Sequence, residues 1–192
     1  MLELHRRTMS QSTEIVSLIK DEQWELPTPC TEWNLRQLVE HMILDNRGFA
    51  AAAQGEVIDR SVWLLREFDP GLRVEYARSA DDVVTAFRTP VASFWLPRIN
   101  DAITFPAAQA IGFHLLDYLV HGWDVAAAIG YPVAFDEDLI EAVQAIGDRE
   151  VLNGPNRLRP NASFRPALLP KPGESKQDYL LRTLGRSPSW PD

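Results

Sequence analysis

The most constraining feature of the sequence is a long apolar segment at residues 106–129, PAAQAIGFHLLDYLVHGWDVAAAI. Its length and hydrophobicity predict one buried helix, yet it contains His114, Asp117, His121 and Asp124. At roughly 100° per residue, these four side chains fall within an arc of about 80°, next to the apolar face. Burying imidazole and carboxylate groups costs free energy unless each finds a hydrogen bond, a counter-charge or a metal ion. The segment therefore predicts either a metal site or a buried hydrogen-bond network.

The spacing limits which of these residues could share an ion. A histidine and a carboxylate four residues apart lie one helical turn apart, close enough to bind one ion together. His114 and His121 lie two turns apart, about 10 Å along the axis, which is too far. The usable pairs are Asp117 with His121, or His114 with Asp117. A third protein ligand has to come from another helix.

A second helix is predicted at 35–53, with Asn34 as its N-cap, and it offers that third ligand. His41 lies in QLVEHMILDN beside the apolar residues Leu38 and Met42, so it is expected to point inward. Three of the four histidines thus belong to the two most apolar helices, and this concentration favours the metal site. The fourth, His5, is expected on the polar face of the first helix.

The remaining periodicity predicts an all-α protein: a four-helix bundle with long crossover connections and accessory short helices. We expect one domain over 1–192, with residues 153–192 as a proline-rich strap and tail. A short helix at 61–68 and two short extended pieces, or loop, at 94–96 and 102–105 are also expected. The expected helices, one of them capped by Ser79, cover residues 2–21, 35–53, 79–89, 106–129, 136–152 and 176–186.

Composition excludes several function classes. The net charge of −8 argues against a nucleic-acid surface and against binding to an anionic membrane. Cys30 is the single cysteine, so no internal disulfide can form, which suits a reducing cytosol. The sequence shows no signal peptide and no run of about 18 apolar residues. We therefore expect a soluble cytoplasmic protein, and the sequence leaves its oligomeric state open, a homodimer included.

Three segments resemble a known family. Residues 28–56, TPCTEWNLRQLVEHMILDNRGFAAAAQGE, are similar to the opening of the mycothiol-dependent maleylpyruvate isomerase N-terminal family. Residues 113–130, FHLLDYLVHGWDVAAAIG, resemble its later ligand helix, and residues 185–190, GRSPSW, resemble the end of its short actinobacterial members. The resemblance covers nearly the whole chain. It implies a fold of the DinB-like superfamily of metal-binding four-helix bundles.

The resemblance also implies a ligand set and a chemistry. The ligands would be His41, Asp117 and His121, with aspartate at a position where the isomerase has glutamate. Two imidazoles and one carboxylate favour zinc, with nickel, iron and manganese as alternatives. The implied activity is that of a thiol S-transferase or isomerase that uses mycothiol and an electrophilic small molecule. The alternative is a metal-binding sensor or scaffold without catalysis.

Other polar residues near these positions could assist. His114, Asp45 and Asp124 are alternate ligands or supports for a ligand; Asp45 is expected at a solvated surface, and Asp124 could orient an imidazole or pair with an arginine. Asn46 and Arg47 could bind a substrate carboxylate. Cys30 is interpreted as structural.

Overall fold

The structure, a computed structural model of the 192-residue chain, describes residues 1–57, 71–159 and 162–191. It divides into two compact units, Met1–Gly130 and Tyr131–Asp192. The expectation that residues 1–192 act as one domain stays a prediction. The short helix expected at 61–68 lies outside the described residues.

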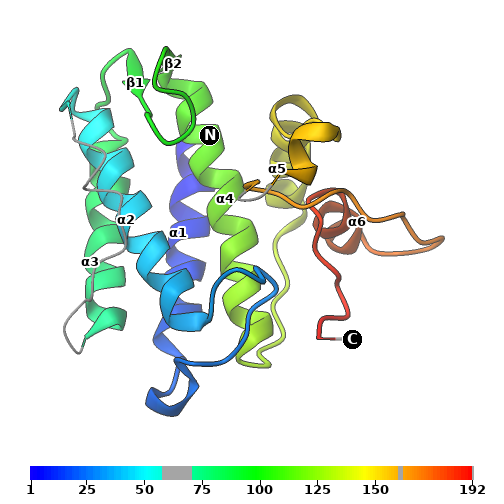
Figure 1. Cartoon of the computed structure of the whole chain (residues 1–192). Coiled ribbons are helices and arrows are strands. Elements are labelled where there is room, and N and C mark those ends of the chain that lie inside the picture. Colours follow the sequence, from blue (N-terminus) through cyan, green and yellow to red (C-terminus); the bar gives the residue numbers. More distant parts are fainter. Residues whose placement is uncertain (58–70, 160–161, 192) are drawn as a thin grey trace. The chain divides into compact units, whose positions relative to one another are not determined.

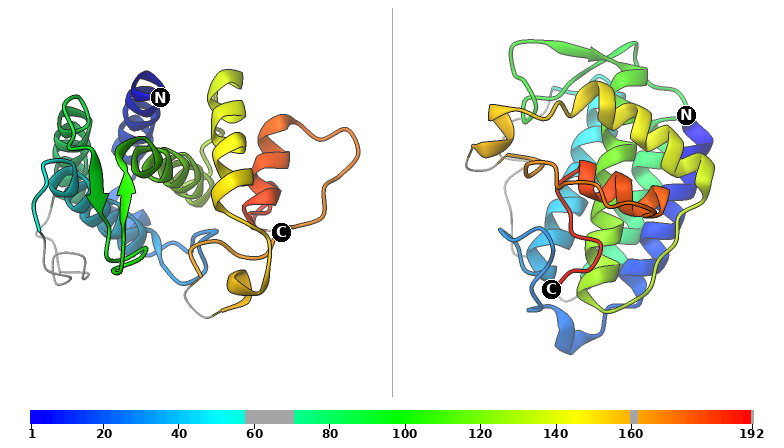
Figure 2. Two further views of the ribbon diagram at one scale, coloured as in Figure 1. Left: turned by 90° about the horizontal axis from the view of Figure 1, so that it is seen from above. Right: turned by 90° about the vertical axis from the view of Figure 1, so that its right-hand side faces the viewer.

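The first unit contains a bundle of four helices, which Figure 1 shows from the side and Figure 2 from the end. They pack in a ring in the order α1, α3, α2, α4, so helices that follow one another in the sequence as α1 and α2, or α3 and α4, lie diagonally. A diagonal step needs a long connection, and residues 18–34 and 87–106 provide one each. The predicted all-α bundle with crossover connections is thus confirmed. The helices are α1 (Leu2–Ser17), α2 (Leu35–Ala53), α3 (Leu72–Ala86) and α4 (Ala107–Ala128).

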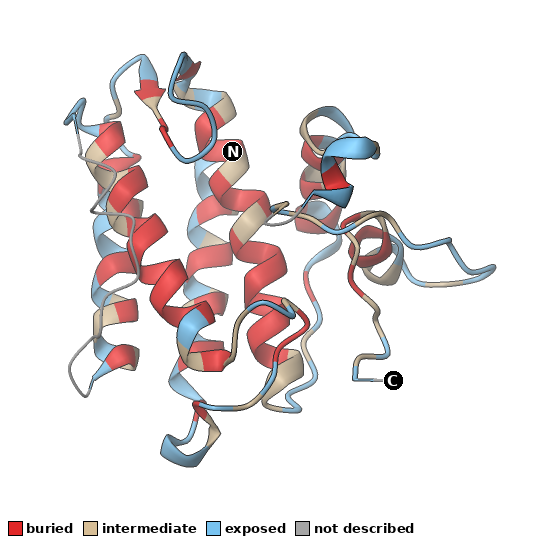
Figure 3. Cartoon of the chain, viewed as in Figure 1, coloured by how far each residue is buried: buried red, intermediate tan, exposed pale blue. Residues whose placement is uncertain are grey.

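The core of the bundle is mostly apolar, and Figure 3 shows the buried residues gathered where the helices face one another. Leu35, Leu38, Met42 and Ile43 of α2 are all fully buried, as the periodicity predicts. The hydroxyl of Tyr118 on α4 donates a hydrogen bond to the backbone oxygen of Met42. This bond joins α2 to α4 inside the core.

The start of α2 is held by local hydrogen bonds. The Asn34 side chain accepts a hydrogen bond from the Gln37 backbone at 2.9 Å, and the Gln37 side chain accepts one from the Asn34 backbone at 3.1 Å. The next two backbone N–H groups donate to Leu26 and Trp24 in the preceding connection. These bonds satisfy groups that a helix start otherwise leaves without partners. Asn34 is therefore the N-cap, as predicted.

Replacing Asn34 by alanine is expected to lower the free energy of unfolding by about 1 kcal/mol, the usual cost of losing such a cap. Urea unfolding of the native chain and the variant, followed by circular dichroism, measures the difference. Arg6→Gln is a suitable control, because its pair with Glu3 is exposed and exposed pairs contribute little. Equal stabilities of Asn34→Ala and the native chain would show that the cap contributes nothing.

A short hairpin lies at one end of the bundle (Figure 1). Its strands β1 (Ser93–Trp95) and β2 (Thr104–Pro106) pair antiparallel, with Phe94 opposite Phe105 and both rings buried. The predicted extended pieces at 94–96 and 102–105 are confirmed with small shifts of their bounds. The loop between the strands contains Arg98, which no sequence pattern identified as a candidate site residue.

One predicted helix start is wrong. The helix expected from Ser79 begins at Leu72, with Gly71 as the residue before it. Ser79 lies inside α3, where its buried hydroxyl donates to the Tyr76 backbone oxygen and accepts from Asn46 of α2. A serine that bonds within a helix and across to a neighbour resembles a cap in the sequence alone. The sequence pattern alone therefore could not place Ser79 inside α3.

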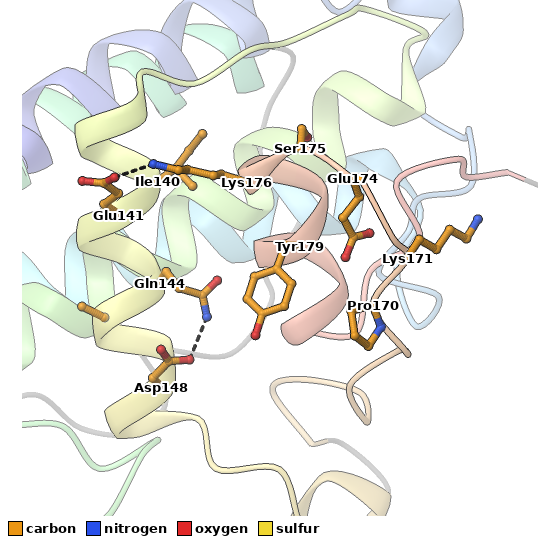
Figure 4. A pocket seen from close by; sticks show the side chains of 12 residues that line it. Ile140, Glu141, Gln144, Asp148, Pro170, Lys171, Glu174, Ser175, Lys176 and Tyr179 are labelled. Carbon is orange, nitrogen blue, oxygen red and sulfur yellow. Dashed lines mark hydrogen bonds and ion pairs between the residues drawn. The ribbon is translucent and has the colours of Figure 1, made fainter.

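The second unit consists of α5 (Glu137–Glu150), the 3-10 helix η3 (Pro155–Leu158) and α6 (Lys176–Thr183). Asp136 precedes α5, as predicted. A hollow of about 570 Å³ lies between α5 and the segment that leads into α6, and it is lined by Glu141, Gln144, Lys176 and Tyr179 among others (Figure 4). The Lys176 ammonium group lies 2.7 Å from a Glu141 carboxylate oxygen, so two of the lining residues form an exposed ion pair.

A bilayer-crossing helix needs about 20 mostly apolar residues, and none of the helices in the described part of the chain meets that requirement.

Candidate metal centre

Three potential metal ligands converge between α2 and α4. His41 comes from α2, and Asp117 and His121 come from consecutive turns of α4. One ligand atom from each lies within 4.8 Å of the other two. Among the described residues this is the one group of three or more such side chains that could hold an ion. The set predicted from the sequence is therefore brought together in space.

His121 lies between two carboxylates of its own helix. Its Nε2 atom is 3.5 Å from Oδ1 of Asp117, and its Nδ1 atom is 3.0 Å from Oδ2 of Asp124. Asp124 is completely buried. A carboxylate on Nδ1 holds the proton there and directs the Nε2 lone pair toward the cluster. The sequence suggested that Asp124 orients an imidazole or pairs with an arginine. The structure shows its carboxylate next to the imidazole of His121.

His41 is buried, with 5% of its surface exposed. Burial holds the pKa of His41 well below its usual value, and repulsion between the protonated forms of His41 and His121 adds to this shift, while the Asp117 carboxylate opposes it. The ring is therefore neutral at pH 7 and keeps a lone pair for a ligand bond. Trp33 covers it at 4.3 Å between ring centroids, and His121 meets it edge-on at 5.3 Å.

Asp45 is not the solvated surface residue that the sequence suggested. It is buried, and one of its oxygens lies 3.5 Å from Nε2 of His41, one turn earlier in α2. Burial raises the pKa of Asp45 to about 6, although the Arg98 guanidinium next to it acts in the opposite direction. Arg98 pairs with Asp45 and reaches Nδ1 of His41 at 3.2 Å. The hairpin loop thus brings a cation to the cluster, which the sequence analysis missed.

His114 belongs to a different buried group. Its Nδ1 atom is 3.0 Å from Nε2 of His5 on α1, and its ring stacks on Tyr118 at 4.0 Å between centroids. The sequence left open whether Asp117 pairs with His114 or with His121. The structure brings Asp117 together with His121. The expectation for His5 is wrong, because only 1% of its surface is exposed. A single histidine among charged residues gives no signal of this contact with a helix 109 positions later.

Asn46 and Arg47 make contacts with α3. The Asn46 amide donates to Ser79 at 2.9 Å, and Arg47 forms an ion pair with Glu75. A substrate-binding role for either residue stays a prediction. Cys30 is half-buried in the connection before α2, where its backbone oxygen accepts a hydrogen bond from the Trp33 backbone at 2.9 Å.

The chain is similar in sequence to known proteins. Two uncharacterised proteins of Mycobacterium tuberculosis, from strains CDC 1551 / Oshkosh and ATCC 25618 / H37Rv, are each 29% identical to the chain. Each alignment covers 95% of this chain and 96% of the relative. No solved structure matches the chain. The model of the mycothiol maleylpyruvate isomerase N-terminal domain matches residues 5–126, which include all three clustered residues. The chain therefore belongs to the mycothiol maleylpyruvate isomerase N-terminal domain family.

Proposed function

We propose that the chain binds a divalent metal ion, zinc in the first place, through His41, Asp117 and His121. The observation that carries the proposal is the convergence of these three ligand atoms, from two helices, within 4.8 Å. Two imidazole nitrogens and one carboxylate oxygen are the ligands of zinc sites that keep one position open. Nickel, iron and manganese accept the same ligand types, so the ligands alone favour zinc without excluding these ions.

The shorter side chain of Asp117 fits this role. Aspartate has one methylene group fewer than the glutamate that the family resemblance implies at this position. Oδ1 of Asp117 nevertheless lies 3.5 Å from Nε2 of His121, one turn later on α4. With 27% of its side chain exposed, Asp117 is also the member of the cluster closest to solvent. The partial exposure of Asp117 supports a site that a small molecule can reach from solvent on the side of this carboxylate.

We further propose that the co-substrate is a low-molecular-weight thiol of the mycothiol type, which the name of the family supports. A bound divalent ion would lower the pKa of such a thiol and hold its sulfur as a nucleophile. The residues of this chain would position the sulfur. Asp124 fixes the ring of His121, and Trp33 covers one face of the ring of His41.

The reaction class that follows is addition or transfer of this thiol to an electrophilic small molecule. In a transfer, a new sulfur–carbon bond forms, the bond from that carbon to its leaving group breaks, and the thiol proton leaves with the departing group. In an isomerisation, the thiol adds to a double bond and is eliminated again after rotation, so no atom is gained or lost. Both reactions need the thiol as its nucleophilic thiolate.

Cobalt-loaded protein provides a direct test, because Co²⁺ occupies zinc sites and its absorption reports its ligands. Adding mycothiol is expected to produce a sulfur-to-cobalt charge-transfer band, and the Asp117→Ala variant is expected to show none. Thiol consumption with a panel of electrophiles then distinguishes an enzyme from a binding module. A cobalt site that does not respond to mycothiol would contradict the proposed thiol chemistry but leave metal binding intact.

A further inference from the structure

Arg98 reaches the candidate metal ligands from a loop. It lies in the hairpin loop between β1 and β2, and one of its guanidinium nitrogens, Nη1, contacts both Asp45 and His41. The distance to Nδ1 of His41 is 3.2 Å. The Asp45 side chain is 12% exposed and the Arg98 side chain 38% exposed. Arg98 therefore enters the cluster from its solvent side and is anchored there by a buried carboxylate.

The chemistry of the two side chains assigns the proton on His41. A guanidinium group has N–H donors and no acceptor, so Nδ1 of His41 has to present its lone pair to Arg98. A neutral imidazole carries one proton and one lone pair, and the proton is therefore on Nε2. That nitrogen lies 3.5 Å from a carboxylate oxygen of Asp45. Both nitrogens of His41 thus face a partner other than a metal ion.

This contact and a metal bond cannot exist together. If the ion binds Nδ1, it takes the lone pair that Arg98 uses. If the ion binds Nε2, the proton moves to Nδ1 and then points at an N–H group of Arg98. In either case the Arg98–His41 hydrogen bond has to break before His41 can serve as a ligand. The two contacts conflict whichever nitrogen the ion prefers.

We propose that Arg98 competes with the metal ion for His41, so that the hairpin loop sets the metal affinity of the site. The guanidinium group holds the ring of His41 by a hydrogen bond, and the ion has to displace it from that ring. Repulsion between a divalent ion and the guanidinium adds to the competition. After displacement, Asp45 still anchors Arg98, so the site can close again when the ion leaves. This inference rests on the proposed ligand role of His41.

The test measures the zinc affinity of the native chain and of Arg98→Gln by competition with a chromophoric chelator. Losing a hydrogen bond to a charged group corresponds to about a tenfold change in affinity or more, so Arg98→Gln is expected to bind zinc at least about tenfold more tightly. Arg98→Met, which has no donor, should behave alike and serves if the glutamine variant folds poorly. Arg6→Gln, which removes the same charge from an exposed pair on α1, should match the native chain.

Nitrogen-15 labelling of the four histidines gives a second readout. In metal-free native protein, Nδ1 of His41 is expected to be unprotonated, and this preference should weaken in Arg98→Gln. After zinc loading, the two proteins should give the same His41 signals, because Arg98 has left the ring.

The outcomes separate the two proposals. If the native chain binds zinc and Arg98→Gln binds it equally or more weakly, the competition is wrong and the metal site remains. An unchanged His41 tautomer in Arg98→Gln would likewise show that Arg98 does not compete for His41. If neither protein binds an ion, the proposed metal site and the role of Arg98 both fail.

Discussion

The His121→Ala variant is expected to lose its metal ion. The native chain, purified without an affinity tag, should contain about one ion per molecule, as a site with three protein ligands does. Removing His121 takes away the ligand that is best held, since Asp124 fixes its ring and Asp117 lies 3.5 Å from its Nε2 atom. The affinity loss should exceed the roughly 10- to 100-fold that is typical of changing a residue behind a ligand. Elemental analysis and chelator competition measure it.

Two further variants make this result specific. Asp124→Asn keeps the size of a fully buried side chain but removes the charge behind His121, so a loss of about 10- to 100-fold is expected. His114→Gln should retain the ion, because His114 bonds to His5 rather than to the cluster. Ion loss in His114→Gln with retention in His121→Ala would favour the pairing of His114 with Asp117 and contradict the proposed ligands.

Helical periodicity accounts for the parts of the site that the sequence could predict. A period of 3.6 residues places Asp117 and His121 on one face of α4, and the apolar neighbours of His41 place it on the inner side of α2. Both helices are long and strongly apolar, so their ends and faces are well determined. The full set of three ligands came from the family resemblance, because the spacing alone also allowed His114 to pair with Asp117.

The residues that the sequence did not predict depend on contacts between distant segments. Arg98 reaches the cluster from a loop, where no period indicates the direction of a side chain. His5 is buried because α1 packs against α4, and its charged neighbours Arg6 and Arg7 conceal this in the sequence. Ser79 resembles a helix cap until its hydrogen bonds to Tyr76 and Asn46 are known. Local sequence patterns therefore predicted which face of a helix is buried, but not which distant residues contact that face.

Acidification is expected to destabilise the bundle through its buried histidine pair. Burial lowers the pKa of His5 to about 4 and holds the pKa of His114 well below its usual value. The Nε2 atom of His114 has no hydrogen-bond partner among the described residues, so a proton there would gain nothing. The ring of His5 contacts the rings of His114 and Phe87, and the ring of His114 also contacts that of Phe49. The folded protein therefore resists protonation at both rings.

The sign of the effect follows from proton linkage. Well above pH 6.5 both rings are neutral in the folded and the unfolded chain, so neither ring contributes to the dependence of stability on pH. Below pH 6.5, the histidines bind protons in the unfolded chain but stay neutral in the folded chain. The free energy of unfolding therefore falls as the pH drops toward the pKa of the folded state. For His5, a shift from about 6.5 to about 4 corresponds to roughly 3 kcal/mol lost over this interval.

Urea unfolding from pH 7 to pH 4.5, with a chelator present so that metal binding does not contribute, measures this loss. His5→Gln removes one of the two groups, so the slope of unfolding free energy against pH should fall by as much as one proton, about 1.4 kcal/mol per pH unit. The variant will start less stable at pH 7 because His114 loses its partner, but the slope is independent of that offset. Identical slopes for His5→Gln and the native chain would show that His5 accepts a proton in the folded protein, and the buried pair would then not be neutral.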